Sequence, residues 1–404
     1  MNVGMKRKFI VIGLTDSRDQ YFSPEIIDVI SSSNVFSGGK RHREIMEPFL
    51  PQSAQWIDIT VPLKTVYERY ESHSEIVVFA SGDPLFYGFG GTLKREFPDA
   101  EIRVYPAFSS LQLLANRMVL PYQDMKNVSL TGRPWHEFDA ALIRGYELIG
   151  VLTDRKCTPV SIAKRMCEYG FDEYEMTVGE CLGNETKERI RTFRVETVRM
   201  MNDDCFEFPN CLILRCVAKR KRKLGIPESE FELLNGREKM ITKSTIRLAA
   251  ISALELDDAE VMWDIGFCTG SVSIEARQMY PELKIVAFEQ RSECRDIIQK
   301  NMIRFGTPGI NVRIGDFLHE DLEGIPAPDA VFIGGHGGKL VDMIGKIIPV
   351  MPEGGRIVLN AVSPGSIMLF EEAVALYGLK IIARQRVVID EHNPILIISA
   401  LKIG

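Results

Sequence analysis

The chain has 404 residues, of which 45% are hydrophobic and 26% charged, so it is neither wholly disordered nor collagen-like and could fill two cores. Its 49 Lys and Arg against 55 Asp and Glu give a net charge of -6, which disfavours a protein that holds nucleic acid by its overall charge. No apolar run approaches the ~18 residues that a membrane span needs, and the run after the basic start is too short for a signal peptide. We therefore expect a cytoplasmic protein of two domains, with no membrane partner.

The eight cysteines show no C-x-x-C spacing of the kind found in zinc ribbons and redox motifs. Several lie in apolar runs, as in Cys211–Cys216, so we interpret them as buried thiols in a reducing compartment. Five of the six histidines also lack metal-ligand spacing, and we expect them at the surface or in the core: His42, His73, His136, His319 and His392. We predict no metal site.

The first half of the chain alternates buried strands with amphipathic helices. Lys8–Gly13 predicts a strand, and Ser23 followed by Pro24 predicts the start of a helix. Further strands are predicted at 76–80, 102–105, 128–130 and 148–152, with helices at 110–118 and 158–169. This alternation is typical of a largely parallel, doubly wound sheet. After about residue 172 strand-like runs with turns predict an antiparallel end to the first domain, up to Val217.

A basic segment divides the chain. Residues 218–227 contain five consecutive Lys and Arg residues followed by Gly and Pro, which we interpret as a solvated linker. A nuclear-localisation or RNA-binding stretch is the alternative, but no aromatic residue interrupts the segment to stack on bases. We place a domain at 6–217, a linker at 218–226 and a second domain at 227–404.

The second half shows a new alternation. Residues 242–254 predict a helix by their apolar spacing, and Val261–Ile265 predicts a buried strand. Further helices are predicted at 271–279 and 294–305, and further strands at 284–289, 311–314, 330–333, 356–359, 380–389 and 395–401. The two halves share no motif, so we expect a fusion of two different α/β domains rather than a repeat.

Three successive strand ends of the second half carry residues suited to a nucleoside. Gly266 and Gly270 follow the first strand, where glycine lets the backbone turn tightly and approach a ligand. Glu289 ends the next strand, 19 residues after Gly270, a position from which an acid can bind both ribose hydroxyls. Gly315-Asp316 ends the third strand, and its carboxylate could accept from an adenine amino group. The ordered set predicts a nucleoside pocket.

The nucleoside ligand is more consistent with S-adenosylmethionine than with a dinucleotide. Pyrophosphate binding favours the fuller G-x-G-x-x-G pattern and a helix N-terminus with no acid beside it. Here Asp264 stands at the strand tip, where its carboxylate would repel a diphosphate. The sulfonium and ammonium of S-adenosylmethionine suit such a carboxylate.

The motifs at 264–275, 287–289 and 329–338 resemble the CbiT family, which methylates carbon 15 of a cobalamin precursor and decarboxylates it. The resemblance covers about 226–402 and implies a Rossmann-like class I methyltransferase fold. The chain departs from the family at Cys268, where the family usually has Gly, so the resemblance does not fix the detailed geometry of this loop. Carried over by motif, the implied cofactor residues are Thr242, Gly266, Phe267, Cys268, Thr269, Gly270, Glu289, Gly315 and Asp316.

In the first half, Ser81–Gly88 follows a buried strand, and its Gly-Asp-Pro turn ends that strand. Together with the segments 106–112, 129–133, 152–159 and 178–183, it resembles the CbiE family of carbon-5 methyltransferases, which belongs to the tetrapyrrole (class III) methyltransferases. The resemblance covers about 6–217 and implies two α/β lobes with the cofactor between them. It departs at residues 11–16, which have fewer glycines than the family loop. The implied cofactor residues are Gly82, Asp83, Pro84 and Phe86, with Ser109, Ser110 and Leu182.

The order of the two halves resembles the fused CobL-type family of precorrin-6B C5,15-methyltransferases (decarboxylating). This implies one S-adenosylmethionine per domain, methyl transfer to carbons 5 and 15 of a tetrapyrrole, loss of the carbon-12 acetate carboxyl, and a homo-oligomer. Whether the substrate is metal-free or contains cobalt stays open. The rival hypotheses are an RNA methyltransferase, which predicts a base-stacking motif absent here, and a sensor of S-adenosylmethionine.

Methyl transfer requires orientation in a dry cleft and no side-chain nucleophile, which agrees with the absence of a recognisable triad in the sequence. His336 is the candidate proton donor for the decarboxylation, since the pKa of histidine suits proton transfer, and a contact to a substrate carboxylate or a plain loop position are the alternatives for this residue. A substrate with several carboxylates needs cations in the clefts of an acidic protein, and the candidates are Arg133, Lys243 and Arg247.

Overall fold

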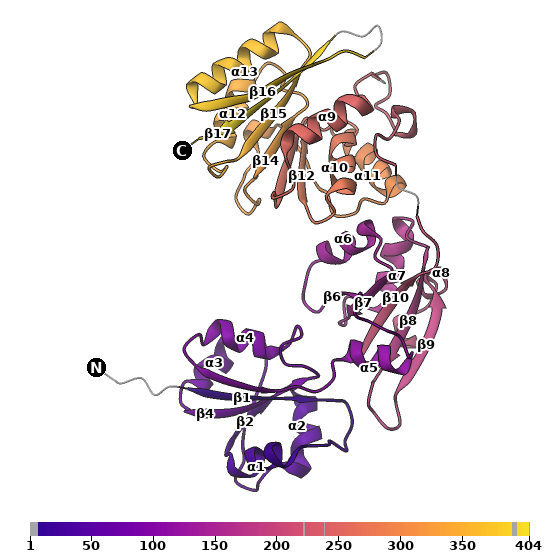
Figure 1. The fold of residues 1–404 in the computed structure, drawn as a ribbon, viewed down its shortest axis with the longest axis vertical. Helices are drawn as coiled ribbons and strands as arrows, with labels where there is room; N and C mark the ends of the chain where they lie inside the picture. The colour runs from indigo at the N-terminus through magenta and orange to yellow at the C-terminus, as the bar shows by residue number, and fades with distance from the viewer. Residues whose placement is uncertain (1–6, 221–222, 238, 390–393, 404) are drawn as a thin grey trace, which may run out of the picture. The chain divides into compact units, whose positions relative to one another are not determined.

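The computed structural model describes residues 7–220, 223–237, 239–389 and 394–403, so residues 221 and 222 of the predicted linker lie outside the description. The chain folds into two compact units (Figure 1). The N-terminal unit comprises residues 1–133, 147–164 and 174–217, and the C-terminal unit comprises 134–146, 165–173 and 218–404. Among the described residues, no helix has the length and apolar character needed to cross a membrane.

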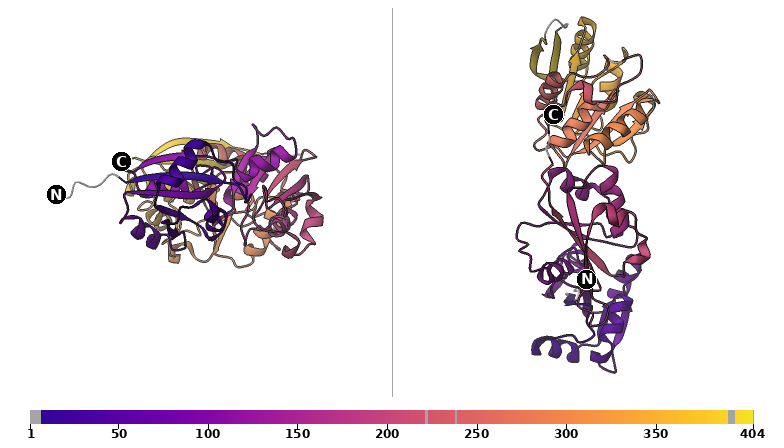
Figure 2. Two further views of the ribbon diagram at one scale, coloured as in Figure 1. Left: turned by 90° about the horizontal axis from the view of Figure 1, so that it is seen from below. Right: turned by 90° about the vertical axis from the view of Figure 1, so that its right-hand side faces the viewer.

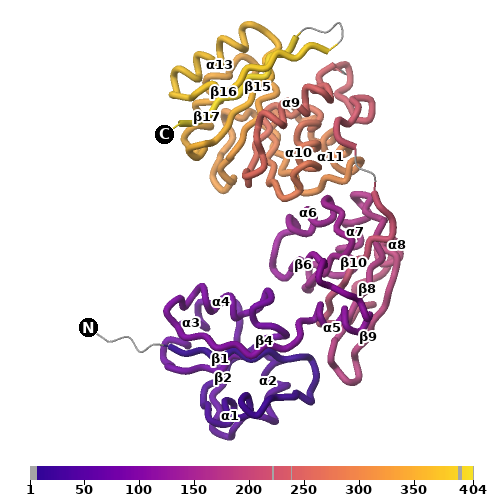
Figure 3. Tube along the Cα trace, viewed as in Figure 1, coloured from indigo at the N-terminus to yellow at the C-terminus, as the bar shows by residue number. Residues whose placement is uncertain are grey.

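The N-terminal unit begins with a parallel five-stranded sheet of order β3-β2-β4-β1-β5, whose strands β1, β2 and β4 lie side by side in the trace of Figure 3. Its strands are β1 Lys8–Leu14, β2 Val35–Gly38, β3 Gln55–Asp58, β4 Glu75–Ser81 and β5 Glu101–Tyr105. Its helices are α1 Pro24–Ser32, α2 Lys40–Met46, α3 Lys64–Tyr70 and α4 Phe89–Glu96, with the 3-10 helix η1 Glu47–Phe49. The side chain of Ser23 caps α1, as its sequence predicts.

Helices cover both faces of this sheet because its strands are apolar on both sides. Phe9 and Val11 of β1 pack toward α3 and α4, whereas Ile10 and Ile12 pack toward α1 and α2. Successive residues of a strand point to opposite faces, so a run without polar alternation marks a strand buried on both sides. The prediction of a doubly wound sheet is confirmed for these strands.

The remaining strands of the N-terminal unit form a second five-stranded sheet of order β6-β7-β10-β8-β9. Only β6 and β7 are parallel, and the other pairings are antiparallel. The alternation alone predicted one sheet for 8–152, and the structure divides these strands between two sheets, as the resemblance to a two-lobed family implied. The antiparallel end after residue 172 is confirmed. The strands are β6 Lys126–Ser129, β7 Leu148–Leu152, β8 Tyr174–Glu180, β9 Arg189–Arg194 and β10 Asn210–Cys216. The helices of this part of the chain are α5 Ser110–Arg117, α6 His136–Arg144, α7 Pro159–Glu168, α8 Val195–Arg199 and η2 Asp203–Cys205, of which α6 and the end of α7 from residue 165 belong to the C-terminal unit.

The C-terminal unit is built on a seven-stranded sheet of order β13-β12-β11-β14-β15-β17-β16. The first five strands are parallel and the last two antiparallel, and the hairpin β16–β17 forms one edge, drawn in yellow in Figure 2. The strands are β11 Val261–Ile265, β12 Lys284–Glu289, β13 Asn311–Ile314, β14 Ala330–Ile333, β15 Arg356–Ala361, β16 Leu379–Val387 and β17 Ile395–Lys402. The helices are α9 Ser244–Leu254, α10 Ser271–Met279, α11 Cys294–Phe305, α12 Leu340–Ile347 and α13 Pro364–Leu376, with η3 Glu228–Glu230 and η4 Phe317–His319.

The strand order of this sheet reverses between β11 and β14. From β11 the chain proceeds outward to β12 and β13, and then returns to the other side of β11 to form β14. In open α/β sheets the connections on either side of such a point leave a crevice at the carboxyl ends of the strands, where ligands bind. The fold therefore directs attention to the loops after β11, β12, β13 and β14.

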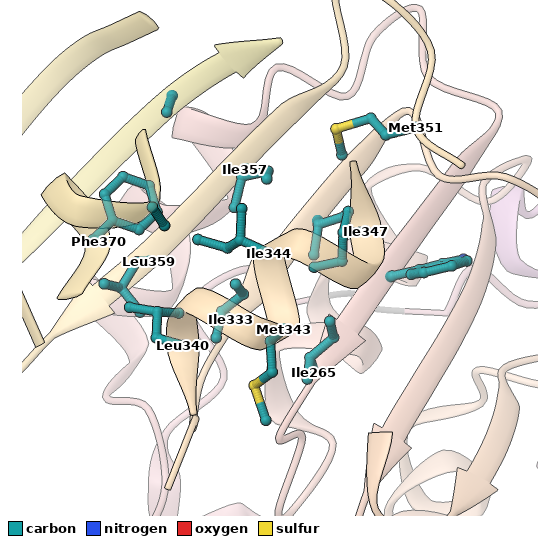
Figure 4. Close-up of a cluster of buried hydrophobic side chains, with 14 of the residues drawn as sticks. Ile265, Ile333, Leu340, Met343, Ile344, Ile347, Met351, Ile357, Leu359 and Phe370 are labelled. Carbon is teal, nitrogen blue, oxygen red and sulfur yellow. The ribbon is translucent and has the colours of Figure 1, made fainter. Parts of the chain in front are cut away.

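Helix α12 anchors the strands that border this crevice. Its apolar residues recur at helical spacing, and Figure 4 shows them directed at the sheet and at α13. Leu340, Ile344 and Ile347 are fully buried in a cluster with Ile333, Ile357, Leu359 and Phe370. This packing fixes the ends of β14 and β15 relative to each other.

We expect the substitution Gly270→Ala to destabilise the C-terminal unit by about 2–5 kcal/mol, as backbone strain plus overpacking. Gly270 has φ +75°, and a Cβ there would lie 2.4 Å from Cγ1 of Ile298 in α11. Gly324 has nearly the same φ, +74°, with no atom within 4 Å of such a Cβ, so Gly324→Ala is the matched control and costs only the strain, about 1 kcal/mol. Urea unfolding of the two variants measures the difference, and equal losses would contradict the role of Ile298.

Candidate functional site

A cavity of about 930 Å³ opens at the carboxyl ends of β11, β12, β13 and β14. Of the nine cofactor residues predicted for the second half, all but Gly270 line it, so one space brings together residues from 242 to 316. Gly270 lies behind the loop, against α11. The segment before α9 supplies Thr242 and Lys243 to the same wall.

The loop after β11 is held by the acid that ends β12. Glu289 is 3% exposed, and its Oε2 accepts a hydrogen bond from the backbone N–H of Cys268 at 3.0 Å. Its Oε1 accepts from Arg291 at 3.1 Å. Cys268 has φ +50°, so it adopts the left-handed backbone that the glycine of related loops adopts freely. The turn of the loop is therefore retained although Cys replaces the usual Gly at position 268. Burial raises the pKa of the Cys268 thiol.

Asp264 is fully buried beside this loop, at the cavity wall. Its Oδ2 accepts from Ser273 Oγ at 2.5 Å, and its Oδ1 has no hydrogen-bond partner among the described residues. Burial raises the pKa of Asp264 to about 7, with the charge of Glu289 adding to the effect and Ser273 opposing it. An unpaired buried carboxylate oxygen is costly, and a cationic ligand group would compensate it.

Asp316, the third acid of the wall, has partners already. Its Oδ1 accepts from the backbone N–H of Leu318 at 3.0 Å, and its Oδ2 lies 3.0 Å from Lys339 Nζ. The hydrogen bond from Lys339 lowers the pKa of Asp316. Acceptance of an adenine amino group by this side chain stays a prediction. Of the three acids, Asp264 keeps an unpaired oxygen, and its carboxylate suits a positively charged group of a cofactor.

His336 lines the cavity, and both nitrogens of its imidazole ring have hydrogen-bond partners. Its Nδ1 accepts from the backbone N–H of Gly338 at 3.1 Å, and its Nε2 lies 2.9 Å from Ser366 Oγ. Since Nδ1 is an acceptor, the neutral ring carries its proton on Nε2. Burial lowers the pKa of His336, so the ring is neutral at neutral pH. Its role as a proton donor stays a prediction.

The interpretation of Arg247 as a cation for substrate carboxylates is wrong. Its side chain is 0% exposed and forms an ion pair with Glu275, which is also 0% exposed. The guanidinium also donates to the backbone oxygens of Thr242, at 2.6 Å, and of Ile226. Arg247 therefore fastens the segment before α9 to α10 and acts on the cavity only by positioning Thr242.

The other two candidate cations have different surroundings. Lys243 lines the cavity of the C-terminal unit, as expected of a residue that meets the substrate. Arg133 stacks over the ring of Tyr87, 5.0 Å from its centroid, and does not line a described cavity. Its predicted contact with substrate has no support in this geometry.

Sequence reasoning missed Asn360 and Lys239, which both line the C-terminal cavity. The carboxamide of Asn360 is buried, and neither of its polar atoms has a hydrogen-bond partner among the described residues. Asn360 lies near the end of β15, so the rule that ligands meet the carboxyl ends of strands could have found it. Lys239 stands in an irregular segment with no such signal.

A second cavity, of about 490 Å³, lies in the N-terminal unit between its two sheets. Gly82, Phe86, Ser109, Ser110 and Leu182 line it, as predicted, whereas Asp83 and Pro84 do not. Gly82 has φ +61°, and a Cβ there would lie 2.9 Å from Cα of Ser109, so only glycine permits this approach of the two loops.

Asp83 and Pro84 instead shape the turn after β4. The Oδ1 of Asp83 accepts from the backbone N–H of Leu85 at 2.8 Å, and the carbonyl oxygen of Pro84 accepts from the N–H of Gly90 at 2.9 Å. Their direct contact with a cofactor stays a prediction.

The N-terminal cavity is also lined by polar residues that were not among the predicted cofactor residues: Asp16, Arg41, His42 and Ser81. His42 was expected at the surface or in the core, and the structure places it in the cavity wall instead. Burial, with the charge of Arg41, lowers the pKa of His42 to about 4. The signal was hidden because His42 follows β2, a strand of four residues that the sequence pattern did not reveal.

We expect Arg247→Ala to destabilise α9 and α10 by about 3–5 kcal/mol, since it leaves the buried carboxylate of Glu275 without its cationic partner, although the backbone N–H groups of Gly225 and Ile226 still donate to it. Hydrogen exchange of these two helices measures the loss. Arg304→Ala is the control, because Arg304 is 51% exposed and its contacts, an ion pair with Glu232 at 4.0 Å and a hydrogen bond to the backbone oxygen of Glu230 at 2.6 Å, lie at the surface. If Arg247→Ala left hydrogen exchange in α9 and α10 unchanged and weakened substrate binding, Arg247 would again be interpreted as a cation that binds substrate carboxylates.

Two family models match the chain. The family described as precorrin methyltransferase domain matches residues 234–395, and the tetrapyrrole (corrin/porphyrin) methylases match residues 8–198. A protein of Sinorhizobium sp named precorrin-6Y C(5,15)-methyltransferase (decarboxylating) is 33% identical over 87% of this chain and 84% of its own length.

Two enzymes of Salmonella typhimurium each match a part of the chain. One, named cobalt-precorrin-7 C(5)-methyltransferase, is 30% identical over 46% of this chain and 91% of its own length. The other, named cobalt-precorrin-6B C(15)-methyltransferase (decarboxylating), is 35% identical over 31% of this chain and 65% of its own length. The chain belongs to the precorrin-6Y C5,15-methyltransferase (decarboxylating) family of S-adenosylmethionine-dependent C-methyltransferases.

Proposed function

We propose that this chain methylates precorrin-6B at carbon 15 in the C-terminal cavity and at carbon 5 in the N-terminal cavity, and removes the carboxyl group of the carbon-12 acetate. The observation that carries the proposal is the presence of two separate cavities, each within residues matched by a different methyltransferase family. One S-adenosylmethionine per cavity follows, together with the domain division at 6–217, 218–226 and 227–404.

In the C-terminal cavity the residues of this chain bind, orient and exclude water. S-adenosylmethionine, when bound, supplies an electrophilic methyl group next to its positive sulfur. Asp264 suits its positive charge, Glu289 holds the loop after β11, and Thr242 and this loop would lie against the cofactor. Methyl transfer then depends on the alignment of donor and acceptor carbons, which a fixed cavity supplies.

The decarboxylation needs a dry environment and a proton. Phe332, Met343, Val362 and Ile395 give the cavity an apolar wall on the side of β14, β15 and β17. A carboxylate placed against such a wall loses hydration, which favours its loss as carbon dioxide. The electrons left behind enter the macrocycle, and we assign the balancing proton to the cationic form of His336, which would lose it and return to the neutral ring.

The N-terminal cavity would work by orientation. Its loops approach closely at Gly82 and Ser109, and Phe86 and Leu182 supply apolar contacts.

The cobalt form of the substrate is the alternative acceptor for both steps. An RNA acceptor is disfavoured, since both family matches are to precorrin or tetrapyrrole methylases. A homo-oligomer and a cytoplasmic location complete the proposal.

Incubation with labelled S-adenosylmethionine and precorrin-6B tests the proposal directly. Two labelled methyl groups and one carbon dioxide per macrocycle are expected. A parallel incubation with the cobalt-containing macrocycle determines whether the enzyme acts on the metal-free or on the cobalt form of the substrate. Transfer to RNA, or no transfer to either macrocycle, would overturn the proposal.

The two transfers should be separable by substitution. Gly82→Val puts a side chain between loops that approach within 2.9 Å, so we expect loss of carbon-5 transfer, with carbon-15 transfer and carbon dioxide release retained. Glu289→Ala should abolish carbon-15 transfer and leave the N-terminal cavity intact. Mass spectrometry of the macrocycle distinguishes the products, and loss of both transfers in each variant would contradict two independent sites.

Binding of S-adenosylmethionine in the C-terminal cavity should strengthen as pH rises through about 7, the pKa of Asp264. A cationic ligand prefers the ionised carboxylate, so below this pKa binding must first release a proton, and affinity falls about tenfold from pH 8 to pH 6. Calorimetry in a Gly82→Val background isolates this cavity. Asp264→Asn should bind more weakly and without this pH dependence, and the same slope in that variant would assign the effect to another group.

A further inference from the structure

The N-terminal cavity contains a connected polar group that the proposed cofactor residues do not use. We call Asp16, Arg41, His42 and Ser81 the Ser81 cluster. Arg41 Nη2 donates to Ser81 Oγ at 2.7 Å, and His42 Nε2 lies 2.9 Å from the same oxygen. Arg41 Nη1 lies 3.3 Å from Asp16 Oδ1. All four residues line the cavity.

The direction of each proton in the cluster follows from these contacts. The backbone N–H of Gly39 donates to His42 Nδ1 at 3.3 Å, so the neutral ring carries its proton on Nε2 and donates it to Ser81. Burial lowers the pKa of His42 to about 4, so the ring is neutral at neutral pH. Two donors therefore converge on Ser81 Oγ, whose own hydrogen must point elsewhere.

No acceptor for the Ser81 hydroxyl hydrogen lies within hydrogen-bond distance in the part of the chain that the structure describes. Ser81 is exposed at the cavity wall, so this hydrogen is available to a ligand there. A hydroxyl whose lone pairs are occupied by two donors serves as an oriented donor rather than an acceptor.

Arg41 supplies the charge beside this donor. Among the described residues that line the N-terminal cavity, Arg41 is the one with a permanent positive charge. Its side chain is 39% exposed, and Asp16, at 12%, holds it through Nη1. The second hydrogen of Nη2 is not used by Ser81. An arginine and a hydroxyl donor side by side match the two oxygens of a carboxylate.

We infer that Arg41 and Ser81 form a carboxylate-binding subsite in the N-terminal cavity, with His42 and Asp16 as positioning residues. The inference rests on the proposed function, in which both ligands carry carboxylates: the macrocycle on its side chains and S-adenosylmethionine on its methionine part. The subsite would fix one of them relative to the other, and so set the alignment for transfer to carbon 5.

Steady-state transfer to carbon 5 by the full chain tests the subsite, with carbon-15 transfer as the internal measure of folding. Arg41→Ala should raise KM for the macrocycle, or Kd for S-adenosylmethionine, by about 10- to 100-fold, the effect of losing a charged hydrogen bond. Ser81→Ala should raise the same constant by about 3- to 10-fold. His42→Ala should act like Ser81→Ala, and His42→Gln, which keeps an N–H donor, should recover part of the loss.

Calorimetry with S-adenosylmethionine in a Glu289→Ala background distinguishes the two sources of the carboxylate. A weaker Kd in Arg41→Ala assigns the subsite to the cofactor, whereas an unchanged Kd with a raised KM assigns it to the macrocycle. Arg43→Ala is the matched control, since Arg43 is exposed on the same helix and outside the cavity wall.

Unchanged KM and Kd in both Arg41→Ala and Ser81→Ala would overturn the inference. If Arg41→Ala also lost carbon-15 transfer through misfolding, Ser81→Ala, which removes only a hydroxyl, would decide alone. Absence of carbon-5 transfer in the unsubstituted chain would instead be a failure of the proposed function, so the two failures are distinguishable.

Discussion

The direction of parallel strands is the constraint on which both sites depend. Parallel strands bring their carboxyl ends to one edge of a sheet, so residues far apart in sequence meet there without further design. In the C-terminal unit this edge gathers Asp264, Glu289 and Asp316 from three strands. In the N-terminal unit it brings Gly82 and Ser109 together and places Ser81 next to the helix that follows β2. The two units share no sequence motif, yet in both of them the cavity lies at the carboxyl ends of parallel strands.

This constraint explains what the sequence could predict. Runs such as Val261–Ile265 are apolar except for Asp264, and β11, β13, β14, α10 and α11 have the bounds expected from the pattern. The first and second strands of that half carry their glycines and acid at their ends, so eight of the nine residues assigned to the C-terminal cavity line it. Position at a strand end identified Gly266, Glu289, Gly315 and Asp316, whereas Thr242, which does not follow a strand of this half, was implied only by the family resemblance.

What the sequence could not show depends on contacts made in space. In the sequence, Arg247 is typical of a ligand-binding cation. In the structure it is buried in an ion pair with Glu275, which lies 28 residues away along the chain. His42 follows a strand of four residues, too short for a recognisable period. The division of the first half into two sheets has the same origin, because β6 pairs with β7 and β7 pairs with β10, rather than with β5. The apolar pattern of a strand does not show which strand it pairs with.

The acids of the C-terminal cavity have a consequence for turnover. Glu289 pairs with Arg291 and Asp316 with Lys339, whereas Asp264 keeps an oxygen without a hydrogen-bond partner among the described residues, so its carboxylate, when ionised, favours the cationic form of the cofactor. In the proposed reaction the sulfur becomes neutral when the methyl group leaves, while the wall keeps its charge. The spent cofactor is therefore held less strongly than a fresh one, and the cavity itself favours their exchange after each cycle.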